Sequence, residues 1–277
     1  KNTSYGLKEK TAQVMRHGGG SVAIYNEDLI LRSLKKLGYA DEEARCFAND
    51  GCWEVQIPGK TNFAYMPFDA LQIWNKVTGI TADKIPEYNS IEELYSAFRD
   101  ALYEAVESLY SSHVKSAYTC QNGVWQARGG IGPDSVVSLF EDGCIEHARA
   151  YYDCGPEYTV RSPHIGGAPD VANSLYAVEK LVFEENKVSF SELVQILKNN
   201  CQDNELLRPY AKHKFVYYGN DSDDADLWHT RLLNDFADMV NSFNEKSNCP
   251  VKFIPGVSTV GRQVDWLPNR CATAFGY

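Results

Sequence analysis

The sequence predicts an α/β fold, in which helices are joined through short buried strands. The first observation is that helical periodicity dominates: apolar residues recur three or four positions apart over 91–117 and 223–243. The second is that short runs of β-forming residues stand between helices, at 21–25, 158–161 and 252–254. The third is length, because 277 residues suit one large domain or two small ones and can bury a sizeable core. The strand signals are few, so periodicity alone leaves the class open.

Two helices are predicted near the N-terminus from their end signals. Asn26 is a good N-cap for a helix over 27–37, and Gly38 ends it. Asp41 opens a second, short helix that runs to about residue 48.

The segment 49–67 interrupts this helical pattern and reads NDGCWEVQIPGKTNFAYMP. It contains four helix breakers and several apolar residues. These are Gly51, Pro58, Gly59 and Pro67, and Trp53, Val55, Ile57, Phe63 and Tyr65. An irregular apolar segment is expected to insert into the protein, where its backbone groups need hydrogen-bond partners.

Further helices are predicted in the second half of the chain. An apolar residue recurs every fourth position over 136–152, at Val136, Phe140, Cys144, Ala148 and Tyr152. The segments 170–184 and 191–199 are also predicted to be helical.

Charge and cysteine usage exclude several classes of function. The net charge of −10 and the pI of about 5.1 argue against nucleic acid or an anionic membrane as the main partner. No apolar run approaches the roughly 20 residues that span a bilayer, and the N-terminal KNTSYGLKEK lacks a signal-peptide core. Eight cysteines without a CxxC motif predict reduced thiols in a cytoplasmic protein.

Cys52 and Glu54 are the first candidate site. If their segment is extended, side chains two positions apart point the same way, so a thiol and a carboxylate would face one cavity. An ordinary nucleophilic cysteine needs a histidine partner, and none of the six histidines lies nearby in sequence. A hydrolase of the Cys-His kind is therefore weakly supported.

Cys144 is the rival, because Gly143-Cys144-Ile-Glu146 repeats the pattern Gly51-Cys52-Trp-Glu54. Its place on an apolar helical stripe favours a small core residue instead. Cys144 and His147 also form a C-x-x-H pair, but zinc needs two more ligands and no second pair has the spacing. The glycine run 18–20 after Arg16-His17 lacks the Lys-Ser/Thr of a phosphate loop.

The string FANDGCWEVQIPGKTNF resembles the cysteine loop of the glycyl radical enzymes, in the pyruvate formate-lyase-like branch with a Gly-Cys-x-Glu signature. Further strings resemble motifs of that family in the same order. They are AIYNED (23–28), FEDGCIE (140–146), PHIGGAPDVANSL (163–175), KLVFEE (180–185), YGND (218–221) and FIPG (253–256). Several ordered motifs are more specific than one short signature.

This resemblance implies that residues 1–277 are one domain, the central part of a ten-stranded α/β barrel wrapped in helices, with the Cys loop at about 49–67 in its centre. It implies a glycyl radical installed by a separate S-adenosylmethionine/iron–sulfur activating enzyme, and no directly bound metal or organic cofactor. Cys52 would be the thiyl residue that removes a hydrogen atom from the substrate, and Glu54 the general base. It further implies a cytoplasmic enzyme of an anaerobic bacterium or archaeon and is compatible with a homodimer. Packaging in a microcompartment is left open.

The C-terminal Gly276-Tyr277 resembles the end of the family's radical motif, Arg-Val-(Ala/Ser)-Gly-(Tyr/Trp/Phe). The preceding Arg and Val are missing, and Gly276 follows the Cys loop too soon. We interpret Gly276 as an internal glycine, so that the radical glycine lies outside this chain and the chain alone is inactive.

The substrate is less constrained, because Trp53 and Val55 replace the family's usual Val and Pro. Asp69 is either a substrate ligand or an N-terminal helix residue. Phe63 and Tyr65, with Trp53, are candidate pocket walls, although core packing explains the first two as well. His164 is interpreted as a structural histidine.

The predicted function is elimination, by a dehydratase or a C–N or C–O lyase, from a small polar alcohol. The alternatives are an arylacetate-type decarboxylase, since Trp53, Phe63 and Tyr65 could form an aromatic pocket, and a non-catalytic relative that binds or assembles. An ordinary thiol enzyme or zinc protein is the remaining class.

Overall fold

The computed structural model describes residues 3–17, 24–51, 53–128, 135–202, 204–258 and 263–277. Its helices are α1 (Tyr5–Arg16), α2 (Glu27–Lys36), α3 (Asp41–Ala44), α4 (Ala70–Val77), α5 (Ile91–Tyr110), α6 (Ser135–Ser138), α7 (Ala168–Val178), α8 (Phe190–Lys198), α9 (Leu207–Lys214), α10 (Asp223–Glu245) and α11 (Gln263–Trp266). Its strands are β1 (Ala48–Asp50), β2 (Glu54–Gln56), β3 (Thr61–Asp69), β4 (Tyr118–Gln121), β5 (Val124–Ala127), β6 (Tyr158–Gly166), β7 (Lys252–Phe253) and β8 (Gly256–Val257). This mixture confirms the predicted α/β class.

A parallel sheet lies at the centre of the molecule. The long strands β3 and β6 pair in register from Thr61 with Tyr158 to Asp69 with Gly166. On its other side β6 pairs in parallel with β7 and then with β8. Two small antiparallel hairpins, β1–β2 and β4–β5, lie outside this sheet.

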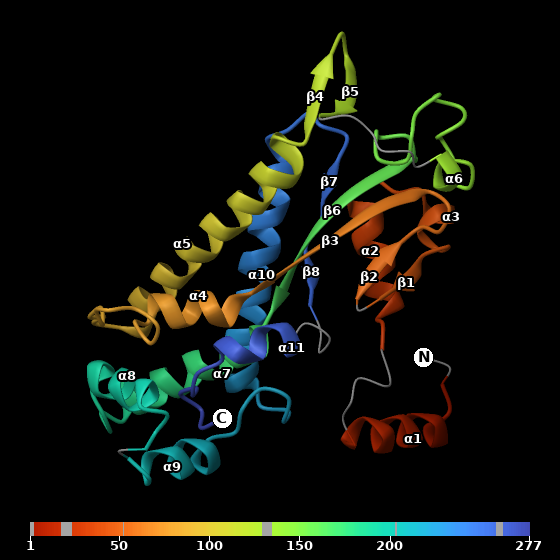
Figure 1. Cartoon of the computed structure of the whole chain (residues 1–277). Helices are drawn as coiled ribbons and strands as arrows, with labels where there is room; N and C mark the ends of the chain where they lie inside the picture. The colour runs from red at the N-terminus through yellow and green to blue at the C-terminus, as the bar shows by residue number, and fades with distance from the viewer. Residues whose placement is uncertain (1–2, 18–23, 52, 129–134, 203, 259–262) are drawn as a thin grey trace.

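The two faces of the sheet meet different surroundings (Figure 1). Helices α4, α5, α7 and α10 lie on one side, and α2, α3 and the β1–β2 hairpin lie on the other. Met66 and Ile165 point to the helical side and belong to the main apolar core. On the same side the buried Arg161 donates to Asn62 Oδ1 (3.1 Å) and to the Tyr118 hydroxyl. Alternation along a strand therefore turns Phe63, Tyr65 and the other odd-numbered residues of β3 to the opposite face.

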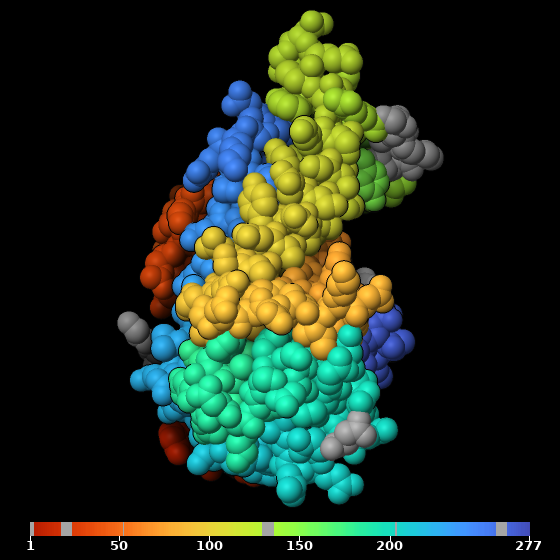
Figure 2. Space-filling model, turned by 90° about the vertical axis from the view of Figure 1, so that its left-hand side faces the viewer, coloured from red at the N-terminus to blue at the C-terminus, as the bar shows by residue number. Residues whose placement is uncertain are grey.

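The helical layer contains most of the core. One stripe of α5 is buried, at Leu94, Tyr95, Phe98, Leu102 and Val106, and it packs beside the buried stripe of α10. A bidentate ion pair joins Arg231 of α10 to Glu92 of α5, with both N–O distances 2.7 Å. Figure 2 shows the outer face of this layer, with α4 and α5 above α8 and α9.

The strongly periodic segments form helices as predicted. The segment 91–117 contains α5 and a π-helical turn, Ser111–Lys115, and 223–243 is α10. Asn26 caps α2 through its side chain, as expected. The segment 170–184 begins slightly earlier, as α7, and ends in a π-helical stretch, Glu179–Glu184. Segment 191–199 corresponds to α8.

The prediction of an irregular loop over 49–67 is wrong in its main part. The segment forms part of β1, all of β2 and most of β3, with turns between them. Gly51 (φ +54°) and Gly59 (φ +74°) make the turns instead of preventing strands. Pro67 is tolerated within β3 because the described part of the chain places a partner strand on one side of β3 only.

The predicted helix over 136–152 is also wrong beyond its first residues. Only α6 is helical, and the chain then continues through turns. Gly143, Ala148 and Cys154 all adopt positive φ, which breaks a right-handed helix. Cys144 is nevertheless buried, as a core residue would be, whereas Phe140 is 76% exposed.

Smaller differences concern four short segments. The helix opened at Asp41 stops at Ala44, and β1 begins before residue 49. Of the strand expected over 21–25, residues 21–23 lie outside the described residues, and Ile24 and Tyr25 are not in a strand. The strand at 158–161 extends to Gly166, and that at 252–254 is limited to Lys252–Phe253.

None of the helices in the described ranges is long and apolar enough to cross a membrane.

Candidate active site

The Gly-Cys-x-Glu sequence lies at the turn of the β1–β2 hairpin, where Asp50 pairs with Glu54. Cys52, the predicted thiyl residue, lies outside the described residues. Its neighbours are described: Gly51 has positive φ, and a Cβ at that position would lie 3.1 Å from Glu54 Oε2. Glycine therefore allows the turn to fold closely over the Glu54 carboxylate.

Glu54 is buried with one carboxylate oxygen unsatisfied. The residue is 7% exposed, and Oε2 has no hydrogen-bond partner among the described residues. Buried polar atoms are normally hydrogen-bonded, and such an exception in a native fold needs an explanation. An acceptor that lacks a donor is suited to accept a hydrogen from a bound molecule.

Trp53 lies beside Glu54 in the hairpin and is half-buried. Its ring packs against Tyr25, with ring centroids 5.0 Å apart. This contact joins the hairpin to the segment before α2. Its predicted role as a substrate-binding wall remains a prediction.

Phe63 and Tyr65 point from β3 to the hairpin side of the sheet, where they meet His164 of β6. Tyr65 lies 4.7 Å from the His164 ring and Phe63 lies 6.2 Å from it, both edge-on and measured between centroids. The Tyr65 hydroxyl forms a 2.7 Å hydrogen bond with Ser258 Oγ, just after β8. The parallel register thus gathers aromatic side chains of β3 and β6 into one cluster, and Ser258 joins it from the position after β8.

His164, which the sequence interpretation treats as a structural histidine, lies at the centre of this cluster. It is 1% exposed, and its Nδ1 lies 3.0 Å from the Ser162 carbonyl oxygen. Its Nε2 has no hydrogen-bond partner among the described residues. Burial lowers the pKa of His164, while the Glu54 carboxylate opposes that shift, so the two groups interact electrostatically. The PHIG string was the available signal, but it does not reveal the unpaired nitrogen.

Gly256 of β8 allows this arrangement. It pairs with His164 in the sheet, and a Cβ at its position would lie 2.5 Å from Nε2. Any side chain at residue 256 would therefore displace the imidazole. The FIPG string contains this glycine, and the close packing of the His164 ring explains why a glycine is needed at that position.

Asp69 lies at the C-terminal end of β3 and caps α4. Its Oδ1 accepts from the Leu71 amide (3.1 Å) and lies 3.4 Å from Arg270 Nη2. Its Oδ2 has no hydrogen-bond partner in the described ranges. Burial raises the pKa of Asp69, although Arg270 opposes the rise. The helix-capping interpretation is confirmed, and substrate binding remains a prediction.

Asp69 lies four positions after Tyr65 along β3, which corresponds to about 13 Å in an extended strand. Arg270 also lies 3.9 Å from Asp170 Oδ2, so it bridges two acidic groups at the carboxyl ends of the strands. Carboxyl ends of parallel strands are where α/β proteins commonly bind ligands.

The remaining candidates lie elsewhere. Within the described ranges, no cysteine forms a disulfide and no group of three or more His, Cys, Asp or Glu side chains is arranged to hold a metal. His147 uses Nδ1 to contact the Gly155 carbonyl oxygen at 3.2 Å. Gly276 is buried against α9 with φ +92°, and its carbonyl accepts from Arg208. Of the run 16–20, residues 18–20 lie outside the described residues.

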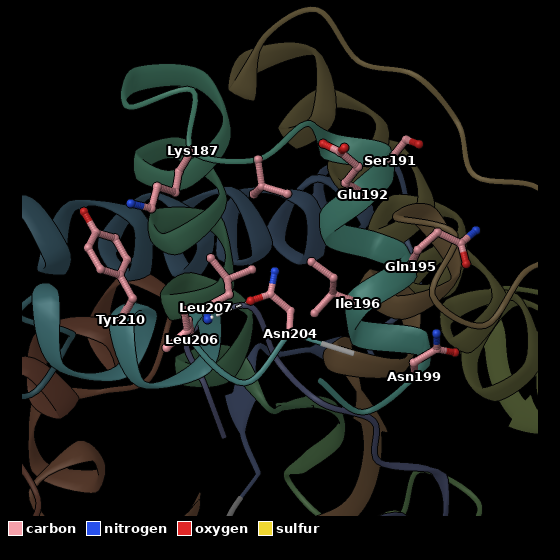
Figure 3. Close-up of a pocket in the computed structure, with 11 residues that line it drawn as sticks. Lys187, Ser191, Glu192, Gln195, Ile196, Asn199, Asn204, Leu206, Leu207 and Tyr210 are labelled. Carbon is pink, nitrogen blue, oxygen red and sulfur yellow. Dashed lines mark hydrogen bonds between the residues drawn. The ribbon is translucent and has the colours of Figure 1, made fainter. Parts of the chain in front are cut away.

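A surface pocket of about 590 Å³ lies between α8 and α9 (Figure 3). Lys187 and Tyr210 stand on one side, and Gln195 and Asn199 on the other. The Lys187 ammonium lies over the Tyr210 ring at 4.5 Å, and the Tyr210 hydroxyl donates to Glu185. This pocket shares no residue with the cluster around Glu54 and His164.

Comparison with known proteins finds consistent similarity. The family model for pyruvate formate lyase-like proteins matches residues 1–266. Trans-4-hydroxy-L-proline dehydratase of Clostridioides difficile is 26% identical over 289 aligned residues, covering 100% of this chain and 34% of that protein. Indoleacetate decarboxylase of Tractidigestivibacter scatoligenes is 27% identical, covering 87% of this chain and 31% of that protein. The chain thus spans about a third of the length of these relatives.

Solved structures show the same fold. The glycerol-bound B12-independent glycerol dehydratase of Clostridium butyricum superimposes with a TM-score of 0.77 at 26% identity. The match covers 100% of this chain and 35% of that one. The 1,2-propanediol dehydration enzyme of Roseburia inulinivorans gives a TM-score of 0.79 at 24% identity, covering 99% and 36%.

Proposed function

Because the chain belongs to the pyruvate formate lyase-like family, we propose that it is part of a glycyl radical lyase acting on a small polar alcohol. The observation that carries this proposal is the Glu54 carboxylate, which is buried beside the Gly-Cys-x-Glu turn with Oε2 unsatisfied. Such a group can accept the proton of a substrate hydroxyl. The relatives that are dehydratases support this reading.

In the proposed reaction, Cys52 transfers a hydrogen atom and Glu54 accepts a proton. A glycyl radical, which we place outside residues 1–277, would supply the oxidising power that converts the Cys52 thiol to a thiyl radical. Cys52 removes a hydrogen atom from the carbon that carries the hydroxyl, and Glu54 takes the hydroxyl proton. The leaving group then departs from the adjacent carbon, and the Cys52 thiol returns the hydrogen atom to the product radical. The burial of Glu54 keeps water away from its carboxylate.

The whole protein, its partners and its setting are part of this proposal. We propose that residues 1–277 form a single central domain of the barrel and are inactive alone. Activation requires a separate S-adenosylmethionine/iron–sulfur enzyme. Because oxygen destroys protein radicals, we place the enzyme in the cytoplasm of an anaerobe.

The test compares Glu54→Gln with Glu146→Gln in the complete, anaerobically activated enzyme. Glu146 occupies the equivalent position in the second Gly-Cys-x-Glu string but is exposed. Electron paramagnetic resonance should detect equal glycyl radical in both variants. Glu54→Gln should lose at least about 100-fold of the turnover of polar alcohols, the scale of one general base. Glu146→Gln should keep wild-type turnover.

Cysteine variants complete the test. Cys52→Ala should abolish turnover, whereas Cys144→Ala should retain it. Turnover in Cys52→Ala would refute the proposal. A wild-type enzyme that never forms the radical would favour a non-catalytic relative.

An arylacetate decarboxylase is the second candidate, because Phe63 and Tyr65 place aromatic rings around His164. The indoleacetate decarboxylase relative is consistent with it. Indoleacetate and polar alcohols should be supplied separately to the activated enzyme. Release of carbon dioxide from indoleacetate, without elimination from the alcohols, would favour this candidate.

A further inference from the structure

Another cavity, of about 540 Å³, lies where α7, the segment 212–220 and the C-terminal segment 270–277 meet. The C-terminus lies beside α7 and α9 in Figure 1. The cavity shares no residue with the cluster around Glu54 and His164, or with the pocket between α8 and α9. Its walls include the Tyr and Asn of the YGND string and two residues of the PHIGGAPDVANSL string, which the proposed reaction does not use.

Aromatic side chains form much of the wall of this cavity. They are Phe215, Tyr217, Tyr218, Phe275 and Tyr277. The Phe275 ring lies 5.5 Å from the Tyr217 ring and 5.4 Å from the Tyr277 ring, measured between centroids. Tyr218 is 36% exposed and Tyr277 is 63% exposed, so ring surface is open to a bound molecule. Such walls favour a flat apolar or aromatic group.

Asp170 of α7 contributes a carboxylate to the cavity. Its Oδ2 lies 3.9 Å from Arg270 Nη1, and Arg270 also pairs with Asp69, so two carboxylates share one guanidinium. Burial raises the pKa of Asp170, which means that its ionised form lacks stabilising partners. A positively charged ligand group would supply one.

Lys212 of α9 contributes an ammonium group from another wall. Its Nζ lies over the Tyr277 ring at 4.0 Å and forms no ion pair with a described residue. Gly276 fixes this arrangement, because its φ is +92° and a Cβ there would lie 3.0 Å from Lys212 Cβ. Asp170 and Lys212 thus face one cavity with opposite charges that do not pair with each other.

Asn173, one turn after Asp170 on α7, adds a neutral donor. A backbone N–H can only donate, so the Tyr218 amide, at 3.0 Å, fixes the side-chain oxygen of Asn173 towards itself. Asn173 Nδ2 forms no hydrogen bond within the described part of the chain and remains available to a ligand.

We propose that this cavity binds an aromatic α-amino acid. The ligand's ammonium pairs with Asp170, its carboxylate pairs with Lys212, and its ring packs on the aromatic walls. Two opposite charges on one small molecule match two charges that face one cavity from different elements. The volume falls in the range of about 300–1,000 Å³ typical of small-molecule sites. The inference is independent of the proposed function, because no residue of the cavity takes part in the proposed reaction.

The first test compares ligands on the complete enzyme without radical activation. The probe is L-phenylalanine, and three analogues each lack one of its features. Phenethylamine lacks the carboxylate, 3-phenylpropionate lacks the ammonium group, and L-alanine lacks the ring. Dissociation constants are measured by ligand-observed NMR. We expect L-phenylalanine to bind at least about tenfold more tightly than each analogue, the scale of one hydrogen bond to a charged group.

Two variants then assign each ligand charge to its partner. Lys212→Met keeps an apolar stem, and it should weaken L-phenylalanine about tenfold while phenethylamine binding stays unchanged. Asp170→Asn should weaken both L-phenylalanine and phenethylamine, with 3-phenylpropionate binding unchanged. Lys187→Met is the matched control, because Lys187 also lies over a tyrosine ring but in the other pocket. It should bind L-phenylalanine as the wild type does.

A measurement on the wild type covers the case in which a variant fails to fold. Irradiation with p-azido-L-phenylalanine should label peptides that contain residues 215–220 or 270–277, as read by mass spectrometry, and excess L-phenylalanine should suppress the label. Labelling confined to the Gly-Cys-x-Glu hairpin would overturn the inference.

The binding measurements can also overturn it. Contradicting results are absence of L-phenylalanine binding, affinity no higher than that of the analogues, wild-type affinity in Lys212→Met, or equal losses in Lys212→Met and Lys187→Met.

Discussion

At the scale of single residues, the site combines groups that burial affects in opposite directions. His164 is held neutral by burial, and Asp69 is shifted towards its neutral form by the same cause. Each also has a partner that opposes this shift, namely Glu54 for His164 and Arg270 for Asp69. In both residues, burial favours the neutral form and the charged partner favours the ionised form. The stability of the folded protein should therefore depend on pH when one of these charges is removed.

Asp69→Asn tests this balance through stability. Because the pKa of Asp69 is raised in the folded protein, its ionised form costs stability once the pH rises through that value. Asparagine keeps an oxygen to cap α4 but carries no charge. We expect the variant to melt at a higher temperature at pH 7, with the gain shrinking as the pH falls towards about 4.

Scanning fluorimetry across this pH range measures the effect. A variant that melts at a lower temperature at pH 7 would mean that the ion pair with Arg270 outweighs burial.

The site residues were only partly predictable from sequence. Glu54 was identified because it follows Cys52 by two positions, a spacing that would turn both side chains the same way if the segment were extended. The contacts of His164 were not predictable, because they depend on the register of β3, β6 and β8. That register joins segments far apart in sequence, and no local pattern encodes it.

At the scale of elements, the long helices were predictable because each needs one apolar stripe over several turns. The failures occurred where residue pattern and backbone conformation disagree. The apolar spacing over 136–152 imitates a helix, but Gly143 and Cys154 adopt positive φ and the chain turns. Conversely, Pro67 and two glycines concealed β3, although the edge position of this strand tolerates a proline.

Helix capping gives a prediction with a matched control. Ser189 forms a reciprocal capping box with Glu192 at the start of α8. Ser222 occupies the same N-cap position of α10 but makes no side-chain capping bond. Ser189→Ala should lower the free energy of unfolding by about 1 kcal/mol. Ser222→Ala should stay within about 0.5 kcal/mol of wild type.

Urea unfolding, followed by circular dichroism, measures both variants. Equal losses would mean that the capping box contributes nothing beyond intrinsic helix propensity.

At the scale of the whole molecule, β6 is the central strand, and β3 is an edge strand within the described part of the chain. Backbone amides in a strand paired on both sides open less readily than those at an edge. In hydrogen exchange we expect the amides of β6 to exchange more slowly than those of β3. Helix α1, which buries none of its residues, should exchange fastest and serves as the control.

Mass spectrometry of peptides covering these segments provides the measurement. Equal protection of β3 and β6 would mean that a further segment covers the outer edge of β3.

The parallel register also has a consequence for how the chain reaches this structure. Thr61 pairs with Tyr158, and Val160 pairs with Lys252, so each step across the sheet joins distant parts of the chain. Long-range pairing of this kind is slow, because loop closure must precede the contacts that stabilise it. During synthesis β3, α4 and α5 leave the ribosome well before β6. Their apolar side chains therefore stay exposed to solvent until the later elements are made. We therefore expect folding to depend on protection of this early half until the later strands arrive.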